Sequence, residues 1–235
     1  MNKTSPLAIM AMIGAAVLCF GILSVDAADN GWITGTVKYE GTPPKPRPVD
    51  ITKDKEVCGL KPHFEEDLIV GANGGIANAV VYVADAKAKP KPETVIFDQK
   101  GCDYEPHVLA FAAGSTIQIK NDDGILHNIH TYSTKNPPIN IAQPQFKKVI
   151  AVKVEKPELI KVTCDAHGWM KGWWFSAANP YYAVTDKNGN FTIKDVPPGN
   201  YEVTVWQEKL GEQKHQVSVK AGAPTTLDVS MKPKA

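Results

Sequence analysis

The sequence lacks a large net charge, a second long hydrophobic run and any long stretch of helical periodicity. Its 235 residues carry 26 Lys and Arg against 25 Asp and Glu, which gives a formal net charge of +1. A nucleic-acid-binding domain is usually strongly basic, so this balance argues against a nucleic-acid partner. No nucleophile–base pair or pair of carboxylates stands out, and we therefore do not expect an enzyme.

The long apolar run lies at the N-terminus and predicts an export signal. The segment from Leu7 to Val25 is almost wholly apolar, and Val25-Asp26-Ala27 follows with residues suited to cleavage. We expect residues 1–27 to be removed near Ala27, which predicts a periplasmic or secreted protein with no membrane span in the mature chain. The alternative is a retained anchor, because the run is nearly long enough to cross a bilayer.

Many short strands separated by turns predict an all-β fold. The chain has 18 glycines and 18 prolines spread along its length, as expected for tight turns. Segments rich in β-forming or alternating residues occur at 32–39, 79–83, 108–111, 116–120, 147–154, 158–163, 190–194 and 201–207. This pattern is typical of a β-sandwich or barrel.

The segment 162–170 carries the most chemical information. Its sequence, Val-Thr-Cys-Asp-Ala-His-Gly-Trp-Met, places Cys164, His167 and Met170 within seven residues. Sulfur ligands favour copper, and two histidines, one cysteine and a weak axial methionine form the copper geometry of electron-transfer proteins. The second histidine has to come from another strand. His127, which follows a strand-like segment and the turn Asn-Asp-Asp-Gly, is the candidate.

These two motifs resemble the cupredoxins, and their Cys-x-x-His-x-x-Met spacing is similar to that of the amicyanin-like members with the shortest ligand loop. In that family an Asn-Asp turn precedes a ligand histidine, and a distant Cys-x-x-His loop follows with a methionine. The resemblance covers residues 102–178 and implies a Greek-key sandwich, which we place at 98–178. It also implies one copper ion in a mononuclear type 1 (blue) site. His127, Cys164 and His167 would be its strong ligands and Met170 its axial ligand.

Other metal sites fit the sequence less well. Structural zinc usually takes four Cys or His ligands, often in close pairs, and one Cys-x-x-His pair is present. A binuclear copper site would need a second thiolate in the loop after Cys164, and that loop has none. A second, weaker copper site that uses His63, His107 or His130 stays open as an alternative.

The cysteine count predicts one disulfide. Three cysteines remain after the predicted signal is removed, and an odd number in an oxidising compartment leaves one thiol over. If Cys164 binds copper, as the resemblance implies, Cys58 and Cys102 are the expected partners. Their bridge would tie the N-terminal segment to the start of the cupredoxin-like unit. The alternative is two free thiols.

The C-terminal part resembles a second family. Residues 183–231 contain the turns Thr-Asp-Lys-Asn-Gly and Pro-Pro-Gly-Asn, and they resemble the carboxypeptidase regulatory-like, transthyretin-related β-sandwich. Members of that family typically begin with a Gly-x-Val and an Ala-x-Val strand, which occur here far upstream, the second within 79–83. The resemblance implies one discontinuous sandwich, residues 31–97 and 179–235, interrupted by the copper unit. The segment 79–83 should then lie beside the start of the C-terminal part.

The implied copper site predicts one-electron transfer. Such a ligand set offers no open position for a substrate, and in cupredoxins the C-terminal ligand histidine reaches the surface through an apolar patch. Here that residue would be His167, surrounded by Ala166, Gly168 and Trp169. A redox partner protein such as a cytochrome or a copper enzyme would dock there. Two alternatives remain: copper delivery or storage, and a structural or adhesive module in which copper is incidental.

Overall fold

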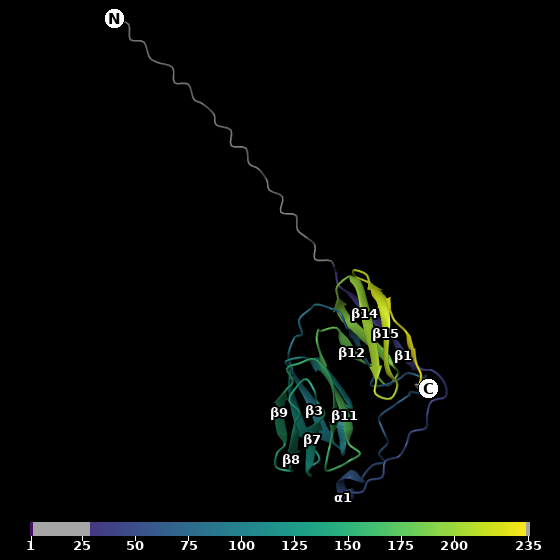
Figure 1. Cartoon of the computed structure of the whole chain (residues 1–235), viewed down its shortest axis with the longest axis vertical. Coiled ribbons are helices and arrows are strands. Elements are labelled where there is room, and N and C mark those ends of the chain that lie inside the picture. The colour runs from purple at the N-terminus through teal and green to yellow at the C-terminus, as the bar shows by residue number, and fades with distance from the viewer. Residues whose placement is uncertain (2–28, 234–235) are drawn as a thin grey trace.

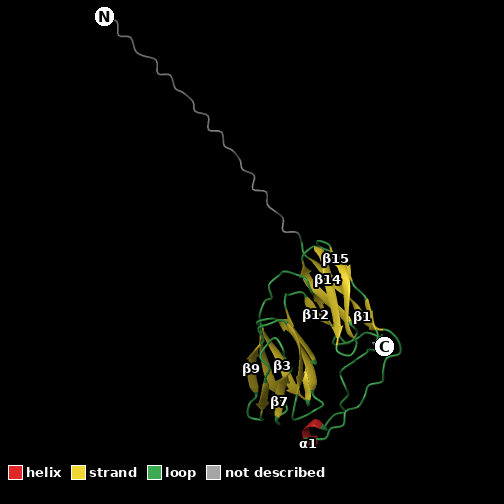
Figure 2. Cartoon of the chain, viewed as in Figure 1, coloured by secondary structure: helices red, strands yellow, loops and turns green. Residues whose placement is uncertain are grey.

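The computed structural model describes residue 1 and residues 29–233, and this part of the chain is nearly all β. Its regular structure consists of strands and one short helix, α1 (Lys55–Cys58), drawn red in Figure 2. The all-β prediction is confirmed. Among the described residues, no helix is both long and apolar enough to cross a membrane. The predicted export signal, residues 1–27, lies outside the described residues except for residue 1.

The middle of the chain forms two facing sheets, which we call the central sandwich. One sheet has the order β4-β3-β6-β9 and the other the order β5-β11-β10-β7-β8. Apolar side chains from both sheets, among them Phe97, Ile119 and Trp174, fill the space between them. The strands are β3 (Thr94–Lys100), β4 (Asp103–Glu105), β5 (Val108–Ala112), β6 (Thr116–Asn121), β7 (His127–Thr131), β8 (Asn140–Gln143), β9 (Val149–Lys153), β10 (Glu158–Thr163) and β11 (Lys171–Ala177).

The two ends of the described chain together form a second pair of sheets, the flanking sandwich. Its sheets have the orders β13-β1-β16, with β17 also paired to β1, and β12-β2-β14-β15. In the second sheet Ala183 lies opposite Val81, so the expected proximity of these two segments is observed. The strands are β1 (Gly31–Tyr39), β2 (Val80–Val83), β12 (Tyr182–Val184), β13 (Asn190–Val196), β14 (Gly199–Gln207), β15 (Gly211–Val219), β16 (Pro224–Thr226) and β17 (Val229–Met231).

The two sandwiches lie side by side in Figure 1 and are joined by side chains of β2 and β11. In both strands, alternate side chains point into a sandwich core and into the interface. Val81 and Val83 point into the flanking core, while Tyr82 packs in a separate apolar cluster between the sandwiches. Its ring centroid lies 4.8 Å from that of Phe175. On β11, Trp174 is buried in the central core, and the neighbouring Trp173 packs in the cluster between the sandwiches. Because successive strand residues point to opposite faces, each of these strands serves one core and the interface.

The predicted boundary at residue 98 differs from the observed start of the central sandwich. Residues 94–99 pair with β6, so β3 belongs to the central sheet from Thr94 onward. The burial of β3 alternates, but its sequence does not, because the apolar Ile96 is exposed and the polar Gln99 is buried, which explains why no strand was expected there. The Lys- and Pro-rich segment before it, 87–92, has no regular structure and connects the two sandwiches.

The segment between β1 and β2 leaves the flanking sandwich and crosses to the far end of the central one. Figure 1 shows α1 at the tip of this excursion. Cys58 in α1 forms a disulfide with Cys102, which confirms the predicted pair. Cys58 lies within the central hydrophobic cluster, and Ile51 and Val57 pack against that cluster. This part of the N-terminal segment is therefore attached to the central sandwich, although its sequence neighbours belong to the flanking one.

Candidate metal centre

Neighbouring strands of the central sandwich bring the predicted ligands together. His127 is the first residue of β7, and Cys164 directly follows β10. These strands are antiparallel neighbours, paired through Thr163 and His130, so the start of β7 lies beside the end of β10. His167 and Met170 lie in the loop that joins β10 to β11, and this loop is closed at its base because Thr163 pairs with Lys171. Strand register, and not proximity in the sequence, thus places His127 beside the Cys-x-x-His loop.

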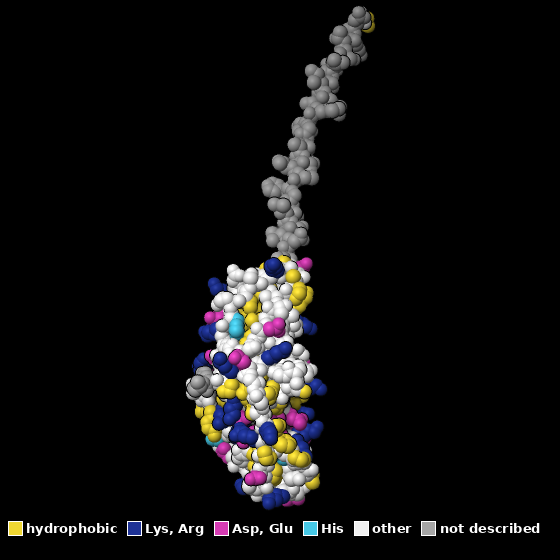
Figure 3. Space-filling model, turned by 90° about the vertical axis from the view of Figure 1, so that its right-hand side faces the viewer, with side chains coloured by type: hydrophobic (Ala, Val, Ile, Leu, Met, Phe, Trp, Pro, Cys, Tyr) yellow, Lys and Arg dark blue, Asp and Glu magenta, His cyan; other side chains and the backbone are white. Residues whose placement is uncertain are grey.

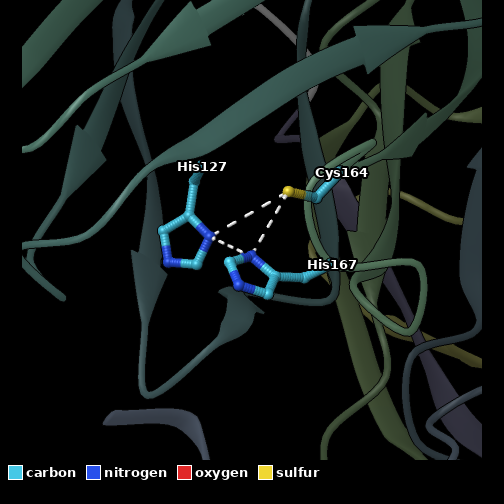
Figure 4. Close-up of side chains that lie close together, drawn as sticks. All are labelled: His127, Cys164 and His167. Atoms are coloured by element: carbon cyan, nitrogen blue, oxygen red, sulfur yellow. Dashed lines mark hydrogen bonds between the residues drawn. The ribbon is translucent and has the colours of Figure 1, made fainter. Parts of the chain in front are cut away.

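Three of the four predicted ligand side chains converge on one point (Figure 4). The Nδ1 atoms of His127 and His167 lie 2.9 Å apart. The Sγ atom of Cys164 lies 3.9 Å from Nδ1 of His127 and 3.8 Å from Nδ1 of His167. All three residues are buried, and these atoms lie within 4.8 Å of one another. A buried triangle of one thiol sulfur and two imidazole nitrogens is the donor set that a soft or borderline cation prefers.

The size of this triangle suits a trigonal metal site. Metal–sulfur and metal–nitrogen bonds of about 2.3 and 2.0–2.1 Å, as in zinc proteins, set sulfur–nitrogen separations of about 3.8 Å at trigonal angles. The two sulfur–nitrogen distances match this spacing. The nitrogen–nitrogen distance is shorter than the roughly 3.5 Å that the same bond lengths require. A bound cation would therefore separate the two imidazoles slightly and leave the sulfur where it is.

Met170 closes the loop behind these residues. Its backbone N–H donates to the carbonyl oxygen of His167 at 2.9 Å, and its carbonyl oxygen accepts the N–H of Cys164 at 3.2 Å. The side chain is buried and belongs to the central hydrophobic cluster. These backbone bonds fix the short loop as a tight turn, which constrains the positions of Cys164 and His167.

The outer nitrogen of each histidine is bound to a carboxylate. Nε2 of His127 lies 2.8 Å from Asp123, and Nε2 of His167 lies 2.8 Å from Asp54. Each carboxylate accepts the hydrogen bond of an Nε2–H group, which orients the ring with Nδ1 toward Cys164 and leaves Nδ1 as the atom that could bind a metal. The sequence motifs did not identify either aspartate. Asp123 lies in the Asn-Asp turn and could have been found as the acidic residue four positions before His127, whereas Asp54 offers no local signal.

The neighbouring groups favour ionisation of the cysteine. Burial alone would raise the pKa of the Cys164 thiol, but hydrogen bonds with His127 and His167 outweigh it and lower the pKa from 9.0 to about 6. Burial lowers the pKa of His127, yet its hydrogen bonds with Asp123 and Cys164 raise it to about 9. The metal-free cluster therefore favours a thiolate beside a protonated imidazole. Since a metal binds the thiolate and the neutral imidazole, its binding would release a proton.

The prediction that His167 reaches the surface is wrong. The residue is fully buried, and Asp54, from the segment that carries α1, covers its outer edge. Trp169 covers another side, with its ring centroid 5.0 Å from that of His167. Of the residues expected to surround an exposed histidine, Gly168 is exposed and Ala166 is half-buried. The expectation failed because the covering segment lies 113 positions away along the chain.

The other histidines considered for a second copper site bind elsewhere. His63 contacts Asp103 and the carbonyl oxygen of Cys58, and His130 contacts Asp165. His107 lies between Glu66 and Glu208, at the junction of the two sandwiches. None of the three takes part in a group of potential metal ligands within the described part of the chain. A second such group, Cys102 with Asp123 and His127, has its sulfur in the disulfide.

Comparisons with known proteins find one matching family model and several similar solved structures. The model of the carboxypeptidase regulatory-like domain matches residues 176–232. No curated protein matches the chain. Similar solved structures include a purple cupredoxin from Nitrosopumilus maritimus, with 20% identity, a TM-score of 0.31 and coverage of 35% of this chain and 99% of that one. Both families predicted from the motifs therefore appear in the comparisons.

Two further solved structures are similar to less than half of this chain. Amicyanin from Paracoccus versutus is 15% identical with a TM-score of 0.31, and the match covers 41% of this chain and 97% of that one. A copper-containing nitrite reductase from Thermus scotoductus is 20% identical with a TM-score of 0.33. The match covers 40% of this chain and 25% of the reductase, so the chain spans a quarter of that enzyme's length. In each case the likeness concerns less than half of the present chain.

Proposed function

We propose that the chain binds one copper ion through His127, Cys164 and His167, with Met170 as a weak axial ligand, in a type 1 site. The observation that carries this proposal is the buried triangle of Sγ and two Nδ1 atoms, all within 4.8 Å. The thiolate and imidazole donors suit copper, and the free, ionisable Cys164 is the single cysteine in the described residues outside a disulfide.

We propose one-electron transfer as the function of this site. Copper, when bound, would supply a centre that cycles between two oxidation states. The residues of the chain hold their positions during that change, because each ligand side chain is fixed from behind. Asp123 and Asp54 orient the two imidazoles, and the hydrogen-bonded loop fixes Cys164. Burial of all three side chains excludes water from the ligand triangle and leaves no position for a substrate. The chain would then be a carrier and not an enzyme.

The remaining parts of this proposal concern the setting of the protein. A redox partner protein, such as a cytochrome or a copper enzyme, would exchange the electron. Location in the periplasm or outside the cell is supported by the apolar N-terminal run and by the Cys58–Cys102 disulfide. We also propose that the flanking sandwich is one discontinuous domain, in which the central sandwich is an insertion between β2 and β12. The pairing of those two strands supports this division.

Copper storage is a second candidate, favoured by the complete burial of His167. A covered ligand slows the exchange of metal with a partner and limits close approach by a redox protein. The two functions differ in the fate of the metal after reduction, because a carrier retains copper through many cycles. A storage or delivery protein instead releases Cu(I) to an acceptor.

The visible spectrum of the copper-loaded chain tests the site. We expect one copper per chain and an intense sulfur-to-copper charge-transfer band, which Cys164→Ser abolishes. Cys102 and Cys58 are bonded to each other, so no other described thiol can replace Cys164. An unchanged band in the Cys164→Ser protein would disprove the assignment. Repeated reduction and reoxidation with full copper retention would support transfer, and loss of copper to a moderate Cu(I) chelator would support storage or delivery.

A further inference from the structure

The segment that covers His167 is a closed loop with several anchors. We call residues 48–64 the cover segment. Its two ends meet, because Pro48 forms a bridge with Phe64 and the N–H of Val49 donates to the carbonyl oxygen of His63 at 3.0 Å. His63, itself buried, bonds through Nε2 to the carbonyl oxygen of Cys58 at 2.8 Å. The two ends of the cover segment are therefore held together, and the hydrogen bond of His63 fixes its interior.

The tip of the cover segment is attached to the central sandwich. The Cys58–Cys102 disulfide ties it to the turn between β3 and β4. His63 makes a second attachment through Nδ1, which lies 3.1 Å from Asp103. Asp54 precedes α1 in a left-handed conformation, with φ 46° and ψ 44°, which an aspartate adopts at a cost in free energy. Its backbone carbonyl oxygen accepts the N–H groups of Val57 and Cys58, so the strained conformation belongs to the helical turn that carries the disulfide.

The two outer carboxylates are connected through this disulfide. Asp123, which binds His127, also accepts the backbone N–H of Cys102 at 2.8 Å. Asp54, which binds His167, lies one helical turn before Cys58. Each half-cystine thus lies beside the carboxylate that orients one of the two histidines. The aspartates differ in exposure, since the Asp123 side chain is 6% exposed and that of Asp54 is 41% exposed.

We propose that Asp54 is a positioning residue for the copper site, held against His167 by the disulfide-tethered cover segment. This inference rests on the proposed copper function. Asp54 would act in two ways: its hydrogen bond fixes the ring of His167 with Nδ1 toward Cys164, and its negative charge favours Cu(II) over Cu(I). The cover segment adds a barrier, because His167 has no solvent-exposed edge while Asp54 is in place.

Three variants of the full chain separate these effects. Asp54→Asn removes the charge but keeps an acceptor for Nε2–H, and Asp54→Ala removes both. Glu56→Gln is the matched control, because it removes one negative charge from the same exposed helix without contact to His167. Asp54 is partly exposed and forms no part of the hydrophobic core, so both variants should fold, although Asp54→Ala adds backbone strain at φ 46° that Asp54→Asn avoids. Circular dichroism of each variant checks this.

We expect the reduction potential of the copper-loaded protein to rise in the order wild type, Asp54→Asn, Asp54→Ala. A rise of about 59 mV in Asp54→Ala would equal a tenfold change in the preference for Cu(I) for this one-electron couple. Loss of Cu(I) to a chelator should be at least several-fold faster in Asp54→Ala, and Glu56→Gln should match the wild type in both measurements. An Asp54→Ala protein with the potential and release rate of the wild type would overturn the proposal.

A measurement on the metal-free protein keeps this test independent of the copper assignment. Nitrogen NMR of the histidine side chains reports which ring nitrogen carries the proton. Asp54→Ala should shift the Nε2 signal of His167, which loses its hydrogen bond, and leave the Nε2 signal of His127, which stays bonded to Asp123, unchanged. An unchanged His167 signal would overturn the positioning role whether or not copper binds. Failure of the wild type to bind copper, with this NMR change present, would instead disprove the proposed function alone.

Discussion

The two sandwiches differ in what they bury. The flanking core consists of apolar side chains such as Ile33, Val81 and Val205. The central sandwich, in contrast, also buries a group of fully inaccessible polar residues: Gln99, Asn121, His127, Gln143 and His167. Burial of a polar side chain destabilises the folded protein unless the side chain is hydrogen-bonded. A group of buried polar residues therefore needs an explanation.

The buried amides of the central sandwich hold the segments that carry the predicted ligand His127. Gln143 lies opposite His127 in the β7–β8 pair, and it accepts the side-chain N–H of Gln99 at 2.7 Å. Asn121 donates to the carbonyl oxygens of Ile125 and Gln143, which holds the turn that leads into His127. Buried polar side chains of the central sandwich thus hold the turn and the strand pair that carry His127, whereas Thr204 and Gln207, buried in the flanking sandwich, carry no predicted ligand.

Acidic and basic side chains are interspersed over the face shown in Figure 3, with apolar side chains gathered mainly on its lower half. This mixture agrees with the formal net charge of +1. Neither sandwich therefore shows on this face the one-sided charge that would attract a polyanion.

Removal of the disulfide should give the largest change and should affect one sandwich. The bridge closes a loop with a sequence separation of 44 residues. The chain-entropy relation assigns about 4 kcal/mol to a loop of this length. We expect Cys58→Ala with Cys102→Ala to lower the free energy of unfolding by about this amount. Denaturant unfolding followed through tryptophan fluorescence and through the copper band measures it. Loss of stability without any weakening of copper binding would separate the cover segment from the metal centre.

The contact between the sandwiches should be sensitive to pH. His107 of the central sandwich lies 2.5 Å from Glu208 and 3.4 Å from Glu66, and Lys171 lies near the same small pocket. Burial opposes protonation, but these carboxylates raise the pKa of His107 from 6.5 to about 9. A raised pKa stabilises the folded state fully below pH 6.5, and this stabilisation disappears as the pH rises through about 9.

We therefore expect the free energy of unfolding to fall between pH 7 and pH 10, by on the order of 3 kcal/mol. Glu208→Gln should reduce this slope, although Glu208 also accepts the indole N–H of Trp173. Unfolding curves of both proteins across this pH range provide the measurement. Equal slopes in the two proteins would show that His107 does not link the sandwiches in this way.

A matched pair of small substitutions should give the smallest effect and the sharpest comparison. Ile129 in β7 and Ile193 in β13 are both buried, one in each sandwich. Either Ile→Val change should cost about 0.5–1.5 kcal/mol through loss of one methyl group. Ile129 lies two residues after His127 on the same side of its strand, so Ile129→Val should also shift the copper spectrum. A shift of equal size in Ile193→Val would mean that the flanking sandwich also shapes the metal centre.

Local motifs predicted the features that depend on short segments. The spacing of Cys164 and His167, and the turn before His127, led to three residues that the structure brings together. The Cys58–Cys102 pair was predicted by the same reasoning and is present. The family model that matches residues 176–232 agrees with the resemblance of the C-terminal part, and β2 and β12 pair as expected.

The features that depend on long-range packing were not predictable. Nothing in the sequence around Asp54 indicates that it reaches His167. Without knowledge of that contact, His167, which lies between Ala166 and Gly168, was expected to be exposed. β3 was missed because the exposed Ile96 interrupts its pattern. Its place in the sheet depends on parallel pairing with β6, a contact that no local pattern reveals.

The pairing of β1 also has a consequence for the order in which the molecule is assembled. This strand contacts β13, β16 and β17, and the hydrogen bond from Thr34 to Phe191 spans 157 residues. A Cβ at Gly35 would lie 1.9 Å from the carbonyl oxygen of Leu227, so β1 needs glycine there to accept the late-arriving C-terminal segment. During synthesis the central sandwich is made before the strands that pair with β1 and β2. Until then β1 lacks β13, β16 and β17, and β2 lacks β12 and β14. Non-local pairing of this kind folds slowly. A central sandwich that has already folded holds the ends of β2 and β12 near each other, and so shortens the search.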